Sequence, residues 1–226
     1  IYHEVSRMEK NNYLARLQTF VVKHIQAGNL KYMNKLLDAY KYYFEKDDIF
    51  ENGIIPMPPF RSAVLLTNFV KNSEFFEELT SKYSQKLNPD FAEDSRRLCM
   101  AYRSFSNNDF NCCLEHLKKF SFRYQPHKAD VKQLLLKLFY ETQEFDSFFS
   151  LCDSFRHFLH KNKNITDTNK TRYFTFINLS DRIYDMRLSP DKKAPAKLLN
   201  EIENHVYELF YFDKQWILDK LNELLM

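Results

Sequence analysis

The sequence predicts an all-α protein, and three observations carry that prediction. Only Gly28 and Gly53 are present among 226 residues, whereas average usage gives about sixteen glycines. Tight two-residue hairpins depend on glycine, so a fold rich in strands is disfavoured. Apolar residues recur every three or four positions almost from end to end, and no stretch sustains the alternation of a half-buried strand. The short polar breaks between these stripes delimit helices expected at 3–26, 30–48, 60–71, 73–87, 90–106, 109–122, 126–142, 144–162, 166–187, 193–211 and 213–225.

The first helices each carry one apolar stripe. In 3–26 and 30–48 it consists of Leu14, Leu17, Val21 and Ile25, then of Met33, Leu36, Leu37, Tyr40 and Phe44. Aromatic residues run all the way round the second helix at 40–44. We expect that helix to be buried on two sides; an exposed binding surface is the alternative.

The middle helices are set off by prolines and polar turns. The three prolines of 51–60 exclude a continuous helix there, so the next helix is expected from residue 60. The turns at 71–73, 107–109 and 143–144 are short and polar, and the first two contain Asn, which can adopt the left-handed conformation that ends a helix and can cap the next one. Asp90 and Glu93 have the spacing of a capping box at the start of 90–106. Pro126 stands near the start of its helix, where its missing N–H costs nothing.

The stripes of the later helices keep the same rhythm. The stripe of 109–122 consists of Phe110, Cys113, Leu114, Leu117 and Phe120, and that of 126–142 consists of Val131, Leu134, Leu135, Leu138 and Phe139. The stripe of 144–162 consists of Phe145, Phe148, Phe149, Cys152, Phe155 and Leu159. The stripe of 193–211 consists of Leu199, Ile202, Val206 and Leu209. Residues 187–195 form a second long break. The C-terminal aromatic group either docks on the preceding helices or contacts a partner; it consists of Tyr207, Phe210, Tyr211, Phe212 and Trp216.

Composition excludes several kinds of site. Phosphate-cradling loops and dinucleotide fingerprints need closely spaced glycines, which the chain lacks. The net charge is +3, close to balance, which argues against a dedicated nucleic-acid binder. No apolar run is long enough for a membrane helix, and no signal peptide is visible at the N-terminus. Because the sequence begins at Ile1, we expect it to be a fragment of a longer chain.

No catalytic or metal-binding constellation stands out. The four cysteines Cys99, Cys112, Cys113 and Cys152 lie within helical apolar patterns, as expected of reduced, buried thiols in a cytoplasmic protein. His116 lies within helical reach of Cys112 and Cys113, but a zinc site needs three or four converging ligands. The sequence therefore predicts no enzyme, no metal and no cofactor.

The most basic stretch is 156–163, continued by Lys170 and Arg172. It closes a helix, where cations complement the carbonyl end of the helix dipole. The alternative is a small phosphate-contacting patch at 156–172 in a nucleic-acid-associated regulator.

An internal period accompanies the helices. Phe75, Phe110 and Phe145 are spaced by 35 residues, and each follows a polar turn. A period of about 34 residues built from a helix–turn–helix unit is the mark of the tetratricopeptide repeat. Residues 60–160 resemble that family, with Ala101 at its small first-helix position and Leu117 at the large apolar position of its second helix. Leu136 and Cys113 depart from the pattern.

The resemblance implies an irregular, right-handed stack of antiparallel helical hairpins, an α-solenoid, in one domain over 1–226, with the further helices 166–226 following the repeats. It implies a concave surface lined by the first helix of each pair, and a protein or peptide partner. The residues that would line this surface are Thr67, Lys71, Tyr102, Ser106, Lys137 and Glu141. The function expected is a non-catalytic protein-interaction or scaffolding module with no membrane contact.

Overall fold

The computed structural model describes residues 6–26, 29, 31–46, 50–120, 125–188, 193–204 and 209–226. Within these residues every regular element is a helix, apart from an isolated bridge between Glu51 and Ile54. The all-α prediction is therefore confirmed. The chain divides into two compact units, Ile1–Arg123 and Tyr124–Met226, and the boundary falls inside the region of the predicted repeat. The prediction of a single domain stays a prediction.

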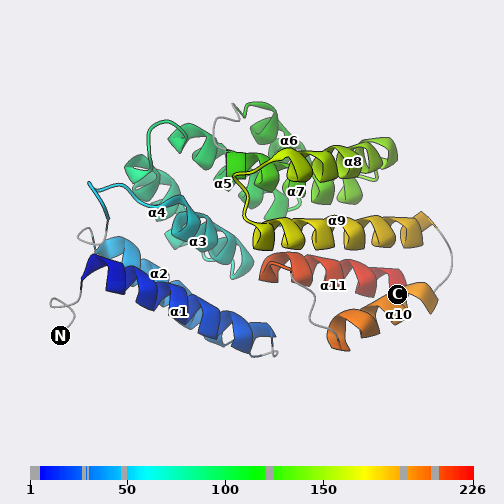
Figure 1. The fold of residues 1–226 in the computed structure, drawn as a ribbon, viewed down its shortest axis with the longest axis horizontal. Coiled ribbons are helices and arrows are strands. Elements are labelled where there is room, and N and C mark those ends of the chain that lie inside the picture. Colours follow the sequence, from blue (N-terminus) through cyan, green and yellow to red (C-terminus); the bar gives the residue numbers. More distant parts are fainter. Residues whose placement is uncertain are drawn as a thin grey trace. The chain divides into compact units, whose positions relative to one another are not determined.

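The first unit contains α1 (Arg7–Gln26), α2 (Tyr32–Glu45), α3 (Met57–Phe69), α4 (Ser73–Ser81), the 3-10 helix η3 (Tyr83–Lys86), α5 (Ala92–Ser106) and α6 (Phe110–Lys118). Helices α1 and α2 lie side by side (Figure 1), as do α3 and α4, and α5 and α6. The ring of Phe44 is fully buried at the centre of this unit. Its aromatic neighbours come from four elements and the α2–α3 connection: Tyr40, Tyr43, Phe50, Phe60, Phe75 and Tyr83.

The aromatic run of α2 is mainly core. Tyr40, Tyr43 and Phe44 are buried, and only Tyr42 is largely exposed. The hydroxyl of Tyr43 donates to Asn11 of α1 across 2.8 Å, and the Gln18 amide of α1 donates to the Tyr40 hydroxyl. The expected burial of α2 on two sides is confirmed, and α1 covers one of those sides.

Two helix boundaries differ from the sequence-based expectation. Helix α3 begins at Met57 rather than residue 60, because the first turn of a helix needs no N–H donors and tolerates Pro58 and Pro59. The helix expected over 73–87 ends at Ser81 and continues as the 3-10 turn Tyr83–Lys86. In the α2–α3 connection, Asn52 and Gly53 both have positive φ, the conformation of the hairpin turn that Asn-Gly favours.

Three hairpins are joined by the same turn. In α3–α4, in α5–α6 and in the pair α7 (Gln125–Glu141) and α8 (Phe145–Lys161), the residues with positive φ are Lys71, Asn108 and Gln143. The next N–H, of Asn72, Asp109 or Glu144, donates to the carbonyl five residues earlier at 2.8–2.9 Å. This is the Schellman ending of a helix. The side chains of Asn72 and Asp109 then cap the following helix, so the expected glycine-free turns are confirmed.

The second unit contains α7 (Gln125–Glu141), α8 (Phe145–Lys161), α9 (Asp167–Leu188), α10 (Lys193–Asn204) and α11 (Tyr211–Leu225). Helices α7 and α8 form a hairpin, α9 packs on both, and α11 lies along α9 and α10 (Figure 1). The buried ring of Tyr140 is in contact with Phe148, Tyr184 and Trp216. The core of this unit thus joins α7, α8, α9 and α11.

Two local predictions are wrong. The Asp90–Glu93 capping box does not form: Phe91 is the residue that precedes α5, the Asp90 N–H donates to Asn88, and Glu93 pairs with Arg96 and Arg97 instead. The helix expected over 193–211 is not continuous, because Leu209 and Phe210 are non-helical and Phe210 precedes the first turn of α11. Val206, Tyr207 and residues 189–192 of the 187–195 break lie outside the described residues, and the rest of that break belongs to the ends of α9 and α10. No helix in the described part of the chain is long and apolar enough to span a bilayer.

Candidate functional site

Nucleophilic and metal chemistry find little support in the described side chains. Burial raises the pKa of the thiols of Cys113 and Cys152 to about 12 and that of Cys99 further, which keeps all three protonated at neutral pH and therefore weakly nucleophilic. In the described part of the chain, no three His, Cys, Asp or Glu side chains converge as metal ligands.

The residues expected to line a groove in the first unit are not all at its surface. Thr67 is buried, and its hydroxyl donates to the Val64 carbonyl of its own helix. Lys71 is exposed in the α3–α4 turn. Ser106 is exposed and donates to the Asn68 carbonyl across 3.4 Å, whereas Tyr102 is half-buried. Only Lys71 and Ser106 therefore present largely open side chains.

Helix α11 contacts both residues of the second unit that were expected to line a groove. The Nζ atom of Lys137 lies 2.7 Å from the Asp213 carboxylate. The Glu141 carboxylate accepts hydrogen bonds from the Trp216 indole and from Lys220, each at 2.9 Å. The face of α7 that the repeat pattern assigns to a partner is thus covered by the last helix of the same unit. Of the two roles left open for the aromatic group near Trp216, docking is the one seen.

Further polar groups complete this contact. The Gln133 amide donates to the second carboxylate oxygen of Asp213 across 2.8 Å, and Glu223 lies 2.7 Å from Lys220. Burial lowers the pKa of Lys220, but hydrogen bonds to Glu223 and Glu141 outweigh it, so the net shift is upward. These charges are matched within the unit and hold α11 in register.

Two of the five Lys and Arg side chains in the basic stretch 156–172 have ion-pair partners, whereas Lys161 and Lys163 are exposed. Arg156 lies 2.6 Å from Asp181 and 3.2 Å from Asp153; burial alone lowers its pKa, but these hydrogen bonds raise it overall. Lys170 lies 4.0 Å from Asp167, and Arg172 stacks on the Phe210 ring. Arg156 and Lys170 would have to leave these partners to contact phosphates, which weakens their part in the nucleic-acid alternative.

Helix α1 carries a row of exposed apolar side chains. Tyr13, Leu17 and Phe20 are 60%, 38% and 50% exposed, and their spacing of i, i+4 and i+7 puts them on one side of the helix. Val21 and Ile25, on the adjoining strip of the helix, are buried, in keeping with packing on α2. We call the residues Tyr13, Arg16, Leu17, Phe20 and Lys23 the α1 face.

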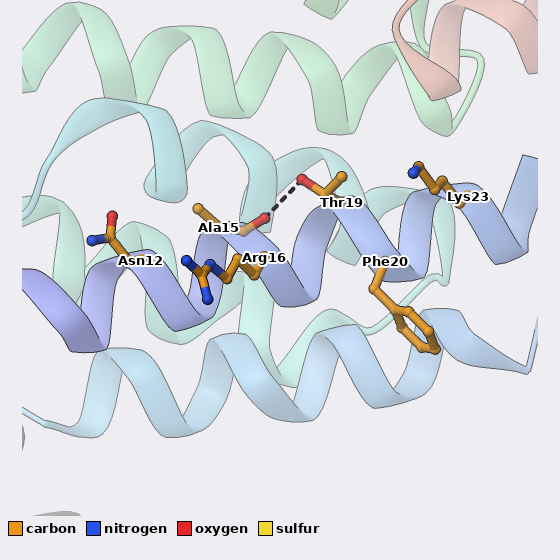
Figure 2. Close-up of a pocket in the computed structure, with 6 residues that line it drawn as sticks. All are labelled: Asn12, Ala15, Arg16, Thr19, Phe20 and Lys23. Atoms are coloured by element: carbon orange, nitrogen blue, oxygen red, sulfur yellow. Dashed lines mark hydrogen bonds between the residues drawn. The ribbon is translucent and has the colours of Figure 1, made fainter.

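A groove adjoins the α1 face. It has a volume of about 510 Å³ and is lined by Asn12, Ala15, Arg16, Thr19, Phe20 and Lys23 (Figure 2). Figure 2 shows Asn12, Thr19 and Lys23 on one side of α1, with the Phe20 ring on the side of α2. A second concavity of about 540 Å³ shares Asn12 and reaches the α2–α3 connection at Glu51, Asn52, Ile54 and Pro56. Met8 to Lys23 spans about 22 Å at the rise of an α-helix.

The rings beside the α1 face are already in contact with one another. Phe20 meets the edges of His24 and Tyr32, with centroids 4.3 and 5.9 Å away. His24 stacks on Tyr32 at 4.5 Å, and Lys31 and Lys35 also lie over that ring. This arrangement fixes the Phe20 side chain while leaving half of it open.

Sequence reasoning missed this surface because it assigned α1 a single stripe. Leu17 was expected in the buried stripe with Leu14, Val21 and Ile25, and the structure instead exposes it. The signal was present: Tyr13, Leu17 and Phe20 form a second stripe at helical spacing. No protein-family model, curated protein or solved structure matches the chain.

Proposed function

We propose that the protein is a non-catalytic protein-interaction or scaffolding module, and that the α1 face receives a helical segment of another protein. The observation that carries the proposal is the row of exposed Tyr13, Leu17 and Phe20 on α1, beside a concavity that Phe20 also lines. Exposed apolar residues scattered singly are ordinary, whereas a contiguous row beside a concavity is typical of a contact surface. Grooves of this kind accept amphipathic helices through anchors at i, i+4 and i+7.

The wider assignment belongs to the same proposal. The repeated turn of α3–α4, α5–α6 and α7–α8 supports a stack of tetratricopeptide-like hairpins. The three protonated, buried thiols support a protein that is not an enzyme, and the free state of all four cysteines supports a reducing, cytoplasmic compartment.

The test is selection from a displayed library of helical peptides on the 226-residue protein. Peptides enriched on the wild type should lose at least tenfold in affinity for Leu17→Gln. The matched control is Met100→Gln, which changes a side chain of the same unit with the same 38% exposure and should bind as the wild type does. Selected peptides that bind both variants equally, or the absence of any enriched peptide, would refute the proposal.

A further inference from the structure

Positive charge around the α1 face indicates the kind of partner that would bind there. Residues 10–37 contain Lys10, Arg16, Lys23, Lys31 and Lys35 and no acidic residue, although the net charge of the whole chain is only +3. The nearest acid on α1 is Glu9, whose carboxylate accepts hydrogen bonds from the N–H and hydroxyl of Ser6. Positive charge is therefore concentrated in this part of the sequence.

Two of these cations belong to the groove. Arg16 and Lys23 are exposed and line it directly. Among the residues that the structure describes, neither has an ion-pair partner. They are seven residues apart, so their Cα atoms lie about 10 Å from each other along the helix axis. Two carboxylates at i and i+7 of a neighbouring helix have the same spacing.

We propose that the occupant of the α1 face is an acidic amphipathic helix. Its apolar side covers Tyr13, Leu17 and Phe20, and its carboxylates, two turns apart, pair with Arg16 and Lys23. The inference rests on the proposed function, because it names the partner of the same surface. A second copy of this chain fits less well, because two α1 faces would bring like charges together.

The geometry favours an acidic protein segment over a nucleic acid. Base stacking needs open aromatic faces. Tyr13 is 60% exposed and offers one, but the Tyr32 ring is covered by His24 and two lysines, and the Phe20 ring is held against both aromatic neighbours. The remaining open side chains include the aliphatic Leu17. A lipid surface is also a poorer fit, because lipid recognition uses clusters of about four to eight cations, and of the five cations of residues 10–37 two, Arg16 and Lys23, line the groove.

The test uses two synthetic helical peptides of about 18 residues, ~27 Å long. Both carry the same leucine stripe at i, i+4 and i+7, and they differ in having Glu or Lys at the flanking positions. Fluorescence anisotropy measures their binding to the wild type, to Arg16→Glu/Lys23→Glu, and to Lys161→Glu/Lys163→Glu. The last variant changes the charge equally at exposed positions of α8 and the turn after it.

We expect the Glu peptide to bind the wild type at least tenfold more tightly than the Lys peptide does. Arg16→Glu/Lys23→Glu should reverse that preference, and Lys161→Glu/Lys163→Glu should preserve it. Equal binding of the two peptides would overturn the acidic partner and leave the proposed interaction function standing, whereas binding of neither would overturn both. A competition experiment tests the two other ligands, a single-stranded RNA of about 20 nucleotides and phosphatidylserine vesicles. If one of them displaces the Glu peptide from the wild type, and Arg16→Glu/Lys23→Glu is the only variant that loses this effect, the inference is overturned in favour of that ligand.

Discussion

The ammonium of Lys137 on α7 and the carboxylate of Asp213 on α11 form a buried ion pair of 2.7 Å, the second oxygen of Asp213 being held by Gln133. Removing one partner of such a pair leaves an uncompensated charge inside the protein, which costs about 3–5 kcal/mol. The ion pair therefore acts mainly on the packing of α11 against α7.

Asp213→Ala should accordingly lower the free energy of unfolding by about 3–5 kcal/mol, measured by urea denaturation. The double variant Lys137→Met/Asp213→Leu should recover most of that loss, because no charge is left unpaired. Glu115→Ala removes the exposed Glu115–Lys118 pair and serves as the control, with a change of at most about 1 kcal/mol. An Asp213→Ala cost as small as the control's would contradict the role given to the pair.

At the left-handed positions of the three shared turns, substitution by glycine should stabilise the protein, unlike the substitution at Asp213. A left-handed backbone costs a non-glycine residue about 1–2 kcal/mol, and glycine loses about 0.5–1 kcal/mol of that advantage to chain entropy. Gln143→Gly should therefore stabilise the protein by about 0.5–1 kcal/mol, seen as a higher Tm. Asn108→Gly should gain less, because asparagine tolerates this conformation. A destabilised Gln143→Gly would contradict the turn geometry.

Buried and exposed apolar positions of α1 should respond differently to truncation. Ile25 is buried, so Ile25→Ala should cost about 2–5 kcal/mol through lost packing. Leu17→Ala should cost less than about 1 kcal/mol, since its side chain is already in contact with water. Chemical denaturation of the two variants distinguishes this arrangement from a single stripe that buries both, in which the two costs would be alike.

Stability should fall in alkaline solution because of the thiols. The unfolded chain releases thiol protons above about pH 8.5, whereas the folded protein retains those of Cys113 and Cys152 up to about pH 12. In that window the unfolded state binds fewer protons, so the free energy of unfolding decreases by up to about 1.4 kcal/mol per pH unit for each thiol.

Denaturation at pH 7.5 and 9.5 measures this effect. A variant with Cys113→Ala and Cys152→Ala should show a smaller decrease than the wild type over the same interval, whatever its stability at neutral pH. Parallel decreases in the two proteins would show that other groups are responsible.

Local periodicity was enough to predict most helices and all three shared turns, because each depends on residues close in sequence. Thr67 shows where it failed: the repeat register places it on a concave surface, but the packing of α3 buries it. Lys137 and Glu141 lie on the side of α7 expected from the pattern, yet the sequence contained no sign that Asp213 and Lys220 would meet them about 75–80 residues later. Pairing at that separation is decided by tertiary contacts, which helical spacing does not encode.

The turns that join the three hairpins also limit how either unit can bend. Each leaves only three residues between two helices, and the N–H of the third is bonded back to the first helix. A change in the angle between the paired helices would break that hydrogen bond, so each pair of helices moves as one rigid body. Bending of either unit would then have to occur between hairpins rather than within them.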